Sequence, residues 1–166
     1  MNPEEWPTAS LGPVARAKVL ASAWPSAAWV EGVLDAPYRA VWSWISDLEH
    51  SIPQFDTTVT RVRVRSRRPA PGEPGVDLVS LTATAFALPL PFDVRLEDGF
   101  CLMRGAARLY LVIMAAEPHS DGARTHFCHV EAVPLPGTTF VRRYLRRETR
   151  SDLDNLTRLA KNGFPG

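Results

Sequence analysis

A run of short strand-like segments between residues 58 and 133 limits the folds open to this chain. The first segment, TVTRVRVRSRR at 58–68, alternates valine with arginine, which is typical of a half-buried strand whose arginines face water. The turn-forming stretch PAPGEPG follows it, so the first two strands should form a hairpin. The later predicted strands cover 76–86, 91–98, 99–106, 107–117 and 123–133, with ALPLP as a loop after the first of these.

The pattern changes on both sides of this run. From Gly137 onward apolar residues recur at helical spacing, and Gly163 predicts the end of one long helix. Before the run, AAWVEGVL at 27–34 predicts a strand that is followed by a short helical segment. Strands that cluster apart from helices indicate an α+β domain, in which helix covers one face of an antiparallel sheet.

The short helical segment carries a large aromatic content for its length. Asp35 and Pro37 supply helix-start signals, and Pro53 is expected to end the segment. The apolar residues recur at spacings of three and four and predict one buried face, formed by Tyr38, Val41, Trp42, Ile45 and Leu48. Trp42 falls on this face and Trp44 does not.

Length and charge exclude several classes of protein. A chain of 166 residues suits one domain, and a net charge of +1 gives no whole-molecule attraction to nucleic acid. No apolar run is long enough for a membrane span, and two glutamates stand near the amino end where a secretory signal needs basic residues. We therefore expect a cytoplasmic protein, and the excess of arginine over lysine suggests a GC-rich bacterial genome.

The sequence also predicts the domain organisation and the state of the cysteines. Residues 1–26 are expected to form a leader, either a packed helix or a loose tail, and residues 27–162 to form the ligand-binding domain. Cys101 and Cys128 both fall in apolar segments, which indicates buried free thiols rather than a disulfide.

The order of elements and the local text resemble the START-like superfamily, also called SRPBCC, over roughly residues 27–162. The stretch APYRAVWSWISDLEHSIPQF is similar to the family's first helices, and EPHSDGARTHF to its glycine turn and final strand. The closing LDNLTRLAKNG resembles the family's leucine-rich last helix. The matching positions are Pro37, Val41, Trp42, Ile45, Asp47 and Pro53, then Pro118, Gly122 and Thr125, and finally Leu153, Leu156 and Leu159.

The resemblance implies the helix-grip fold, in which a curved antiparallel sheet of about six or seven strands wraps a long C-terminal helix. An apolar cavity lies between them, and the first helices roof it. The small residues Ala83 and Ala85 leave space on one strand face beneath the last helix. We expect the ligand-binding wall to consist of Phe55, Leu81, Ala83, Tyr110, Val112, Leu145, Leu153 and Leu156.

The sequence assigns no catalytic residue, metal ligand or cofactor. His126 and His129 form an HxxH pair, but residues three apart on a strand point to opposite faces and cannot chelate one ion. Signatures of a catalytic nucleophile and of a phosphate-binding loop are both missing. The polar candidates for the pocket are Arg104, Arg108, Tyr110 and either His126 or His129, although alternation leaves open which face of 107–117 is concave.

Arginine is concentrated in 61–68 and in the last helix, where Arg142, Arg146 and Arg150 recur every fourth residue. One interpretation is a solvated helix face that pairs with Glu148, Asp152 and Asp154. The other is a weak contact with an anionic surface: phospholipid, RNA or an acidic protein. A domain charge of +1 lacks the basic excess of a nucleic-acid binder.

Three functions follow from these expectations. The first is binding of a hydrophobic small molecule, such as a lipid, an isoprenoid or a polyketide-like compound. The second is a polyketide cyclase or dehydratase type of enzyme, and the third is a protein-interaction module that uses its arginine-rich face. Polar residues converging on a cavity would favour the enzyme, an apolar lining would favour transport or sensing, and a collapsed cavity would favour the module.

Overall fold

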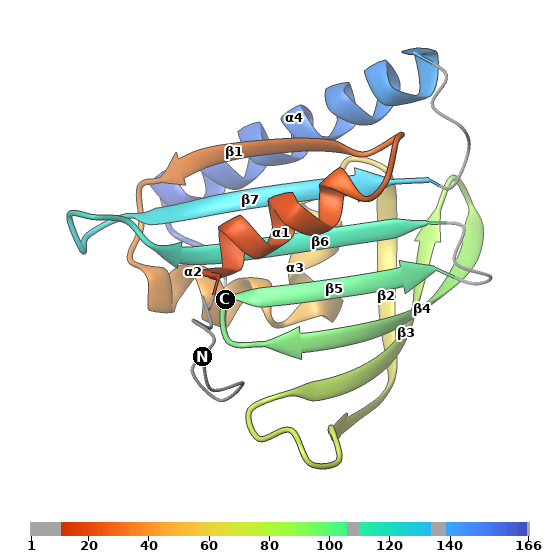
Figure 1. Cartoon of the computed structure of the whole chain (residues 1–166), viewed down its shortest axis with the longest axis horizontal. Coiled ribbons are helices and arrows are strands. Elements are labelled where there is room, and N and C mark those ends of the chain that lie inside the picture. The colour runs from red at the N-terminus through yellow and green to blue at the C-terminus, as the bar shows by residue number, and fades with distance from the viewer. Residues whose placement is uncertain (1–10, 106–109, 134–138, 166) are drawn as a thin grey trace, which may run out of the picture.

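The computed structural model describes residues 11–105, 110–133 and 139–165. In this part of the chain a curved seven-stranded sheet is combined with four helices, as shown in Figure 1. The elements are α1 (Pro13–Ser22), β1 (Ala28–Leu34), α2 (Tyr38–Ile45), α3 (Leu48–Phe55), β2 (Val59–Pro69), β3 (Asp77–Ala85), β4 (Leu88–Glu97), β5 (Phe100–Gly105), β6 (Leu111–Pro118), β7 (Thr125–Ala132) and α4 (Thr139–Asn162).

The sheet is antiparallel throughout, in the order β1-β7-β6-β5-β4-β3-β2. Strands β2 to β7 therefore form one continuous meander, and β1 joins it at the far edge by pairing with β7. The long helix α4 packs against β1 and β7, and α3 packs against β2 and α4. The α+β class and the helix-grip arrangement expected from the sequence are both confirmed.

Two details of the helices and turns differ from the prediction. The short helices expected after the first strand are α2 and α3, but Pro53 lies inside α3 instead of ending the helical region, because a proline in the last turn of a short helix blocks few hydrogen bonds. ALPLP is not a loop, since Phe86 and Ala87 alone make the turn and β4 begins at Leu88. Both turn residues have positive φ, which matches the twist of the flanking strands without the usual glycine or asparagine signal.

The sheet has a hydrophobic core on each face. The larger core lies on the concave side, beneath α2, α3 and α4, and includes Trp42, Leu81, Leu153 and Leu156. Trp42 is 7% exposed, as its place on the apolar face predicted, whereas Trp44 is partly buried and stacks on Phe164 with ring centroids 4.7 Å apart.

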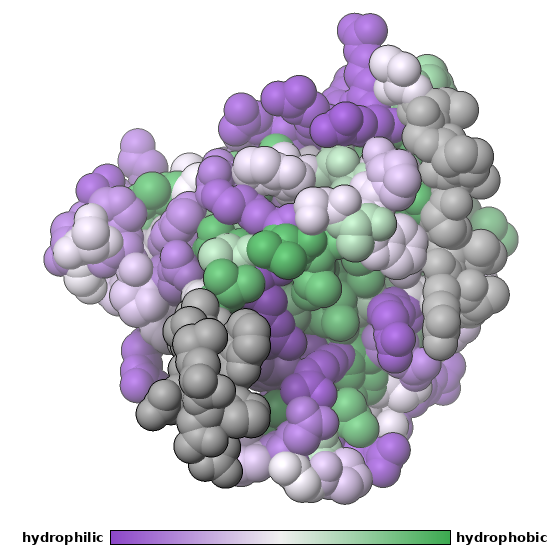
Figure 2. All heavy atoms as spheres, viewed as in Figure 1, coloured by the Kyte–Doolittle hydropathy of each residue, from purple (hydrophilic) through white to green (hydrophobic). Residues whose placement is uncertain are grey.

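Helix α1 forms the second core on the convex side. Its residues Val14, Ala17 and Ala21 are buried against strand residues that include Phe100 and Ile113. Figure 2 shows hydrophobic side chains gathered over this middle part of the face, where Figure 1 places α1. Of the two alternatives for the leader, residues 13–22 are thus a packed helix, and residues 1–10 lie outside the described part.

Both cysteines belong to this buried framework. Cys101 and Cys128 are free thiols, and burial raises the pKa of each to about 12. The expectation of buried free thiols is confirmed.

A candidate binding cavity with an acidic floor

A cavity of about 420 Å³ lies between the concave face of the sheet and the first half of α4. This volume is within the range of small-molecule sites, about 300–1,000 Å³. Most of its wall is apolar and includes Ile52, Phe92, Met103, Met114 and Val141. Phe86 and Tyr144, which are partly or largely exposed, stand at its rim.

Five of the eight wall residues expected from the sequence line this cavity. They are Phe55, Ala83, Tyr110, Val112 and Leu145. Tyr110 and Val112 thus lie on the concave face of the strand predicted at 107–117. Ala85 lines the cavity as well, in agreement with the argument that small residues on β3 leave space there.

The other three expected wall residues, Leu81, Leu153 and Leu156, lie in the filled part of the inner core instead. Leu153 packs directly on β1, because a Cβ atom added at Gly32 would lie only 3.1 Å from Leu153 Cδ2. This close approach of helix to strand leaves no space for a ligand between Leu153 and β1. Leu81 lies two residues before Ala83 on the same face of β3, where larger side chains fill the core.

Three ionisable side chains meet at the floor of the cavity, which His129 and Glu131 line and Asp152 adjoins. His129 and Glu131 are two residues apart on β7 and so point to the same face, and Asp152 approaches from α4. Their exposures are only 2%, 4% and 2%. His129 Nε2 is 3.8 Å from Glu131 Oε1, and its Nδ1 is 3.7 Å from Asp152 Oδ2. Both distances are too long for hydrogen bonds, and among the described residues His129 Nδ1 has no hydrogen-bond partner.

Asp152 is positioned by hydrogen bonds between α4 and the end of α3. The backbone N–H of Thr57 donates to Asp152 Oδ1 at 3.2 Å, and the Thr57 hydroxyl donates to Glu148 at 3.1 Å. Asn155 donates from its side-chain amide to the carbonyl of Phe55 at 3.0 Å. The interpretation that paired Asp152 with surface arginines is therefore wrong, because this carboxyl lies on the inner side of α4.

Burial keeps all three floor groups neutral near pH 7. It raises the pKa of Glu131 to about 8, with a further contribution from the nearby charge of Asp152. Burial likewise raises the pKa of Asp152 to about 8, with Asp56 adding to the effect. It lowers the pKa of His129 to about 4, and, together with Glu131, raises the pKa of Tyr110 well above its usual value.

The floor residues are of types that can ligate a metal, and one ligand atom from each lies within 4.8 Å of the others. However, the two imidazole nitrogens face different carboxyls, so one ion cannot occupy both contacts. Binding would also require two carboxyls with raised pKa values to lose their protons. The geometry thus gives a metal only a partial ligand set, and the sequence expectation of no metal stays a prediction.

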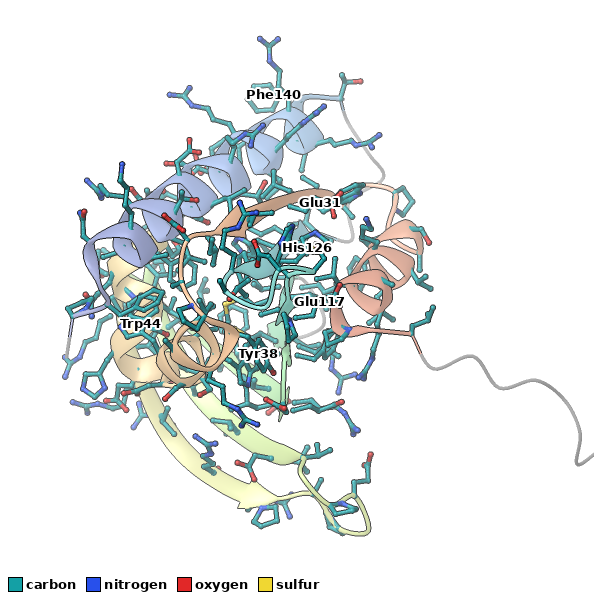
Figure 3. The ribbon with its side chains drawn as sticks, turned by 90° about the vertical axis from the view of Figure 1, so that its left-hand side faces the viewer. Glu31, Tyr38, Trp44, Glu117, His126 and Phe140 are labelled. Carbon is teal, nitrogen blue, oxygen red and sulfur yellow. The ribbon has the colours of Figure 1, made fainter. Side chains whose placement is uncertain are left out.

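His126 lies on the opposite face of the sheet from His129, as their spacing predicted. Its Nε2 is 3.2 Å from Glu31 and its Nδ1 is 3.4 Å from Glu117, and Figure 3 shows it between these two carboxylates. Glu117 in turn accepts from the backbone N–H of Val14 at the start of α1. His126 therefore takes part in attaching α1 and does not reach the cavity.

The remaining polar candidates divide in the same way. Tyr110 lines the cavity and interacts with Glu131. Arg104 instead lines a separate groove together with Ser80 and Asp93. Arg108 lies outside the described residues. Glu131 and Asp152 were missed by sequence reasoning.

Comparison with known proteins bears on the fold. No family model and no curated protein sequence matches the chain. Among solved structures it is similar to the hypothetical protein jhp0584 from Helicobacter pylori, with a TM-score of 0.62 and 13% identity over 93% of this chain and 99% of that one. It is also similar to the di-domain ARO/CYC BexL from the BE-7585A biosynthetic pathway, with a TM-score of 0.53 and 11% identity, covering 89% of this chain and 53% of BexL.

A third similar structure is Ara h 8.0201, with a TM-score of 0.51 and 9% identity over 82% of this chain and 98% of that one. At such identities the likenesses show the fold alone. The chain has the START-like, SRPBCC-type helix-grip fold. None of its described helices is long and apolar enough to cross a membrane.

Proposed function

We propose that the protein binds an apolar small molecule, such as a lipid, an isoprenoid or a polyketide-like compound, in the cavity beneath α4. The observation that carries this proposal is a mainly apolar space of about 420 Å³ inside a fold whose other cores are closely filled. An empty apolar space of this size costs stability, and an apolar guest regains the lost contacts. The likeness to BexL and Ara h 8.0201 supports a small-molecule site in this fold.

The test is occupancy of the cavity. Native mass spectrometry of the purified protein should identify a co-purifying apolar compound, and the delipidated protein should bind the neutral dye N-phenyl-1-naphthylamine. Ala83→Phe should abolish dye binding because Ala83 is on the cavity wall, whereas Thr84→Phe, on the other face of β3, should not. A folded Ala83→Phe variant that bound the dye as well as the parent would refute a binding site beneath α4.

A second candidate is proton-transfer catalysis of the cyclase or dehydratase type. The specific observation in its favour is that His129 and Glu131 lie together on the cavity floor with pKa values displaced in opposite directions. Pairs of this kind supply acids and bases that work near neutral pH.

A reaction that needs only a buried base tests this candidate without knowledge of the substrate. In 5-nitrobenzisoxazole a base takes the C3 proton, the N–O bond breaks, and its electrons remain on the phenolate oxygen. At pH 9, where Glu131 is ionised, we expect a rate at least about 10²-fold above buffer. Glu131→Gln should lose this rate and Glu31→Gln, on the other side of the sheet, should keep it. Equal rates for the two variants would contradict the catalytic role.

The arginine strip, formed by Arg142, Arg146 and Arg150 on α4, is proposed to make a weak contact with an anionic membrane surface. Arg142, Arg146 and Arg150 are exposed, and within the described residues none of them has a carboxylate within 4 Å. Figure 2 shows hydrophilic side chains along the upper edge, where Figure 1 places α4, while Phe140, 79% exposed, extends from the first turn of α4 in Figure 3. An aromatic side chain beside arginines suits a membrane interface.

Vesicle sedimentation tests this contact. The protein should sediment with vesicles of phosphatidylcholine and phosphatidylglycerol and not with phosphatidylcholine alone, and salt should weaken the binding. Replacing Arg142, Arg146 and Arg150 by glutamine should remove it. The open cavity, in contrast, gives no support to a module that acts only through protein contacts.

The expected domain and compartment are retained in the proposal. All described cavity residues fall within residues 27–162, which supports assigning ligand binding to that part. The buried free cysteines support the cytoplasmic location.

A further inference from the structure

The ionisable groups that face the cavity are mostly carboxyls. Asp56, Glu131 and Glu148 line it, and Asp152 lies beside them at the floor. No lysine or arginine is among the described residues that line the cavity. His129 supplies no compensating charge, because burial lowers its pKa to about 4.

These groups also leave acceptor positions unfilled. His129 Nδ1 is buried and finds no hydrogen-bond partner among the residues that the structure describes, and both carboxyls nearest to His129 lie beyond hydrogen-bond distance. Two of the carboxyls are partly satisfied, since one oxygen of Asp56 accepts from the backbone N–H groups of Thr58 and Val59, and Asp152 Oδ1 accepts from that of Thr57. The floor of the cavity can thus receive a group that donates several hydrogen bonds, and burial makes such unfilled acceptors costly.

We infer that, given the proposed binding function, the cavity selects an amphiphile whose polar end is a cationic amine and rejects one that ends in a carboxylate. An ammonium group donates three hydrogen bonds, which matches the imidazole nitrogen and the two carboxyls. Its charge is attracted by Glu131 and Asp152 in a site of low dielectric. Above about pH 8, where Glu131 and Asp152 have lost their protons, a carboxylate at the same place would meet like charges and bring no donor.

Amine binding is then linked to proton release. The groups that face Glu131 are His129 from β7, Tyr110 ahead of β6, Asp152 and Glu148 from α4, and Asp56 after α3. Near pH 6.5 the floor carboxyls hold protons, and an arriving ammonium displaces one of them. Amine affinity should therefore rise with pH toward about 8, where Glu131 ionises without the ligand.

A matched set of ligands tests the inference. Dodecylamine, dodecanol and dodecanoate share one chain length, and each is titrated against bound N-phenyl-1-naphthylamine at pH 6.5 and pH 8.5. We expect dodecylamine to bind at least about tenfold more tightly than dodecanoate at pH 8.5, with dodecanol between them. Glu131→Gln should remove most of this preference, while Glu31→Gln, on the other side of the sheet, should keep both the preference and the dodecanol binding of the parent.

The outcomes separate this inference from the proposed function. Equal binding of the three ligands, or tightest binding of dodecanoate, overturns the amine selectivity and leaves apolar binding intact. Failure of the dye and of all three ligands to bind overturns both. A third outcome would assign the floor to a metal instead: Zn²⁺ alone raises the melting temperature, Glu131→Gln removes this effect, and the three amphiphiles bind equally. If Glu131→Gln does not fold, Asp152→Asn is the second variant, because it keeps an acceptor for Thr57.

Discussion

At the level of single residues, the cavity floor is the costly part of this structure. Buried ionisable groups destabilise a fold unless they are neutral or paired, and His129, Glu131 and Asp152 avoid charge by opposite displacements of their pKa values. Neutral ionisable groups that line or adjoin a cavity are available to a ligand. The free energy needed to ionise them should appear in the pH dependence of protein stability.

The folded protein holds more protons on Glu131 and Asp152 than the unfolded chain does between about pH 4.5 and pH 8. Stability from these carboxyls is therefore complete at low pH and is lost as the pH rises to 8. His129 acts in the opposite direction, but only between about pH 4 and 6.5. From pH 6.5 to 8 we expect the free energy of unfolding to fall by roughly 1–2 kcal/mol per carboxyl.

Urea unfolding at pH 6.5 and pH 8 measures this loss. Glu131→Gln has no proton to lose at that position, so the fall should be about half as large in the variant. A free energy of unfolding that stayed level or rose over this interval would show that the floor carboxyls ionise as exposed ones do.

Trp42 provides a second prediction at this level. Its ring is buried in the inner core and attaches the two-turn helix α2 to the sheet. Trp42→Ala should lower the free energy of unfolding by about 3–5 kcal/mol, as other large-to-small core changes do. Chemical denaturation measures the loss, and an unchanged midpoint would be inconsistent with the buried position.

Residue patterns allowed part of the site to be predicted. Small alanines on β3 indicated where space would remain. The alternation of side chains along a strand predicted that His126 and His129 lie on opposite faces of the sheet. The same spacing places Glu131 on the face of Phe127 and His129, and Asp152 follows Leu145 and Thr149 on the buried side of α4. Both patterns were present in the sequence, but a carboxylate at such a position is ordinarily solvated. Only the packing of α4 on β7 brings Glu131 and Asp152 together.

At the level of elements, α1 shows what composition alone could not decide. Its residues suit a helix, and the sequence favoured a packed helix only slightly over a loose tail. The sheet decides between them, because its convex face carries Phe100, Leu111 and Ile113, which need cover. Ion pairs of Arg16 with Glu97 and Lys18 with Glu31 then fix the orientation of the helix.

Two substitutions on α1 test its structural role. Ala17 is fully buried against the sheet and Val19 is largely exposed on the same helix. Ala17→Asp should cost about 3 kcal/mol or more because it buries an unpaired carboxylate, whereas Val19→Asp should change stability by less than about 1 kcal/mol. Thermal melting of the two variants compares them directly, and similar melting temperatures would argue against a packed α1.

At the level of the whole molecule, the order of elements sufficed to predict the fold class, because a strand meander closed by a long helix has few compact solutions. The order could not predict how the sheet edges are protected. One edge is β2, whose Arg61, Arg63 and Arg65 are exposed. Charged side chains on an edge strand prevent pairing with another sheet.

Replacing Arg61, Arg63 and Arg65 by threonine should leave thermal stability nearly unchanged and accelerate association. Threonine suits a strand, so the variant keeps the fold but presents an open edge. Light scattering over time measures the association. The control is the glutamine variant of Arg142, Arg146 and Arg150, which loses the same charge from α4, and equal association of both would attribute the effect to net charge.

Strand β1 is the first strand along the chain, but in the part that the structure describes it pairs only with β7, which is the last of the seven strands to be synthesised. As the chain leaves the ribosome, β1 has no partner until nearly the whole domain has emerged. Meanwhile β2 to β6 can form their hairpins one after another, with their apolar inner face still uncovered. We therefore expect folding to finish in a late step in which β7, β1 and α4 close the sheet together, and until then the unfinished meander exposes an apolar face that a chaperone would have to cover.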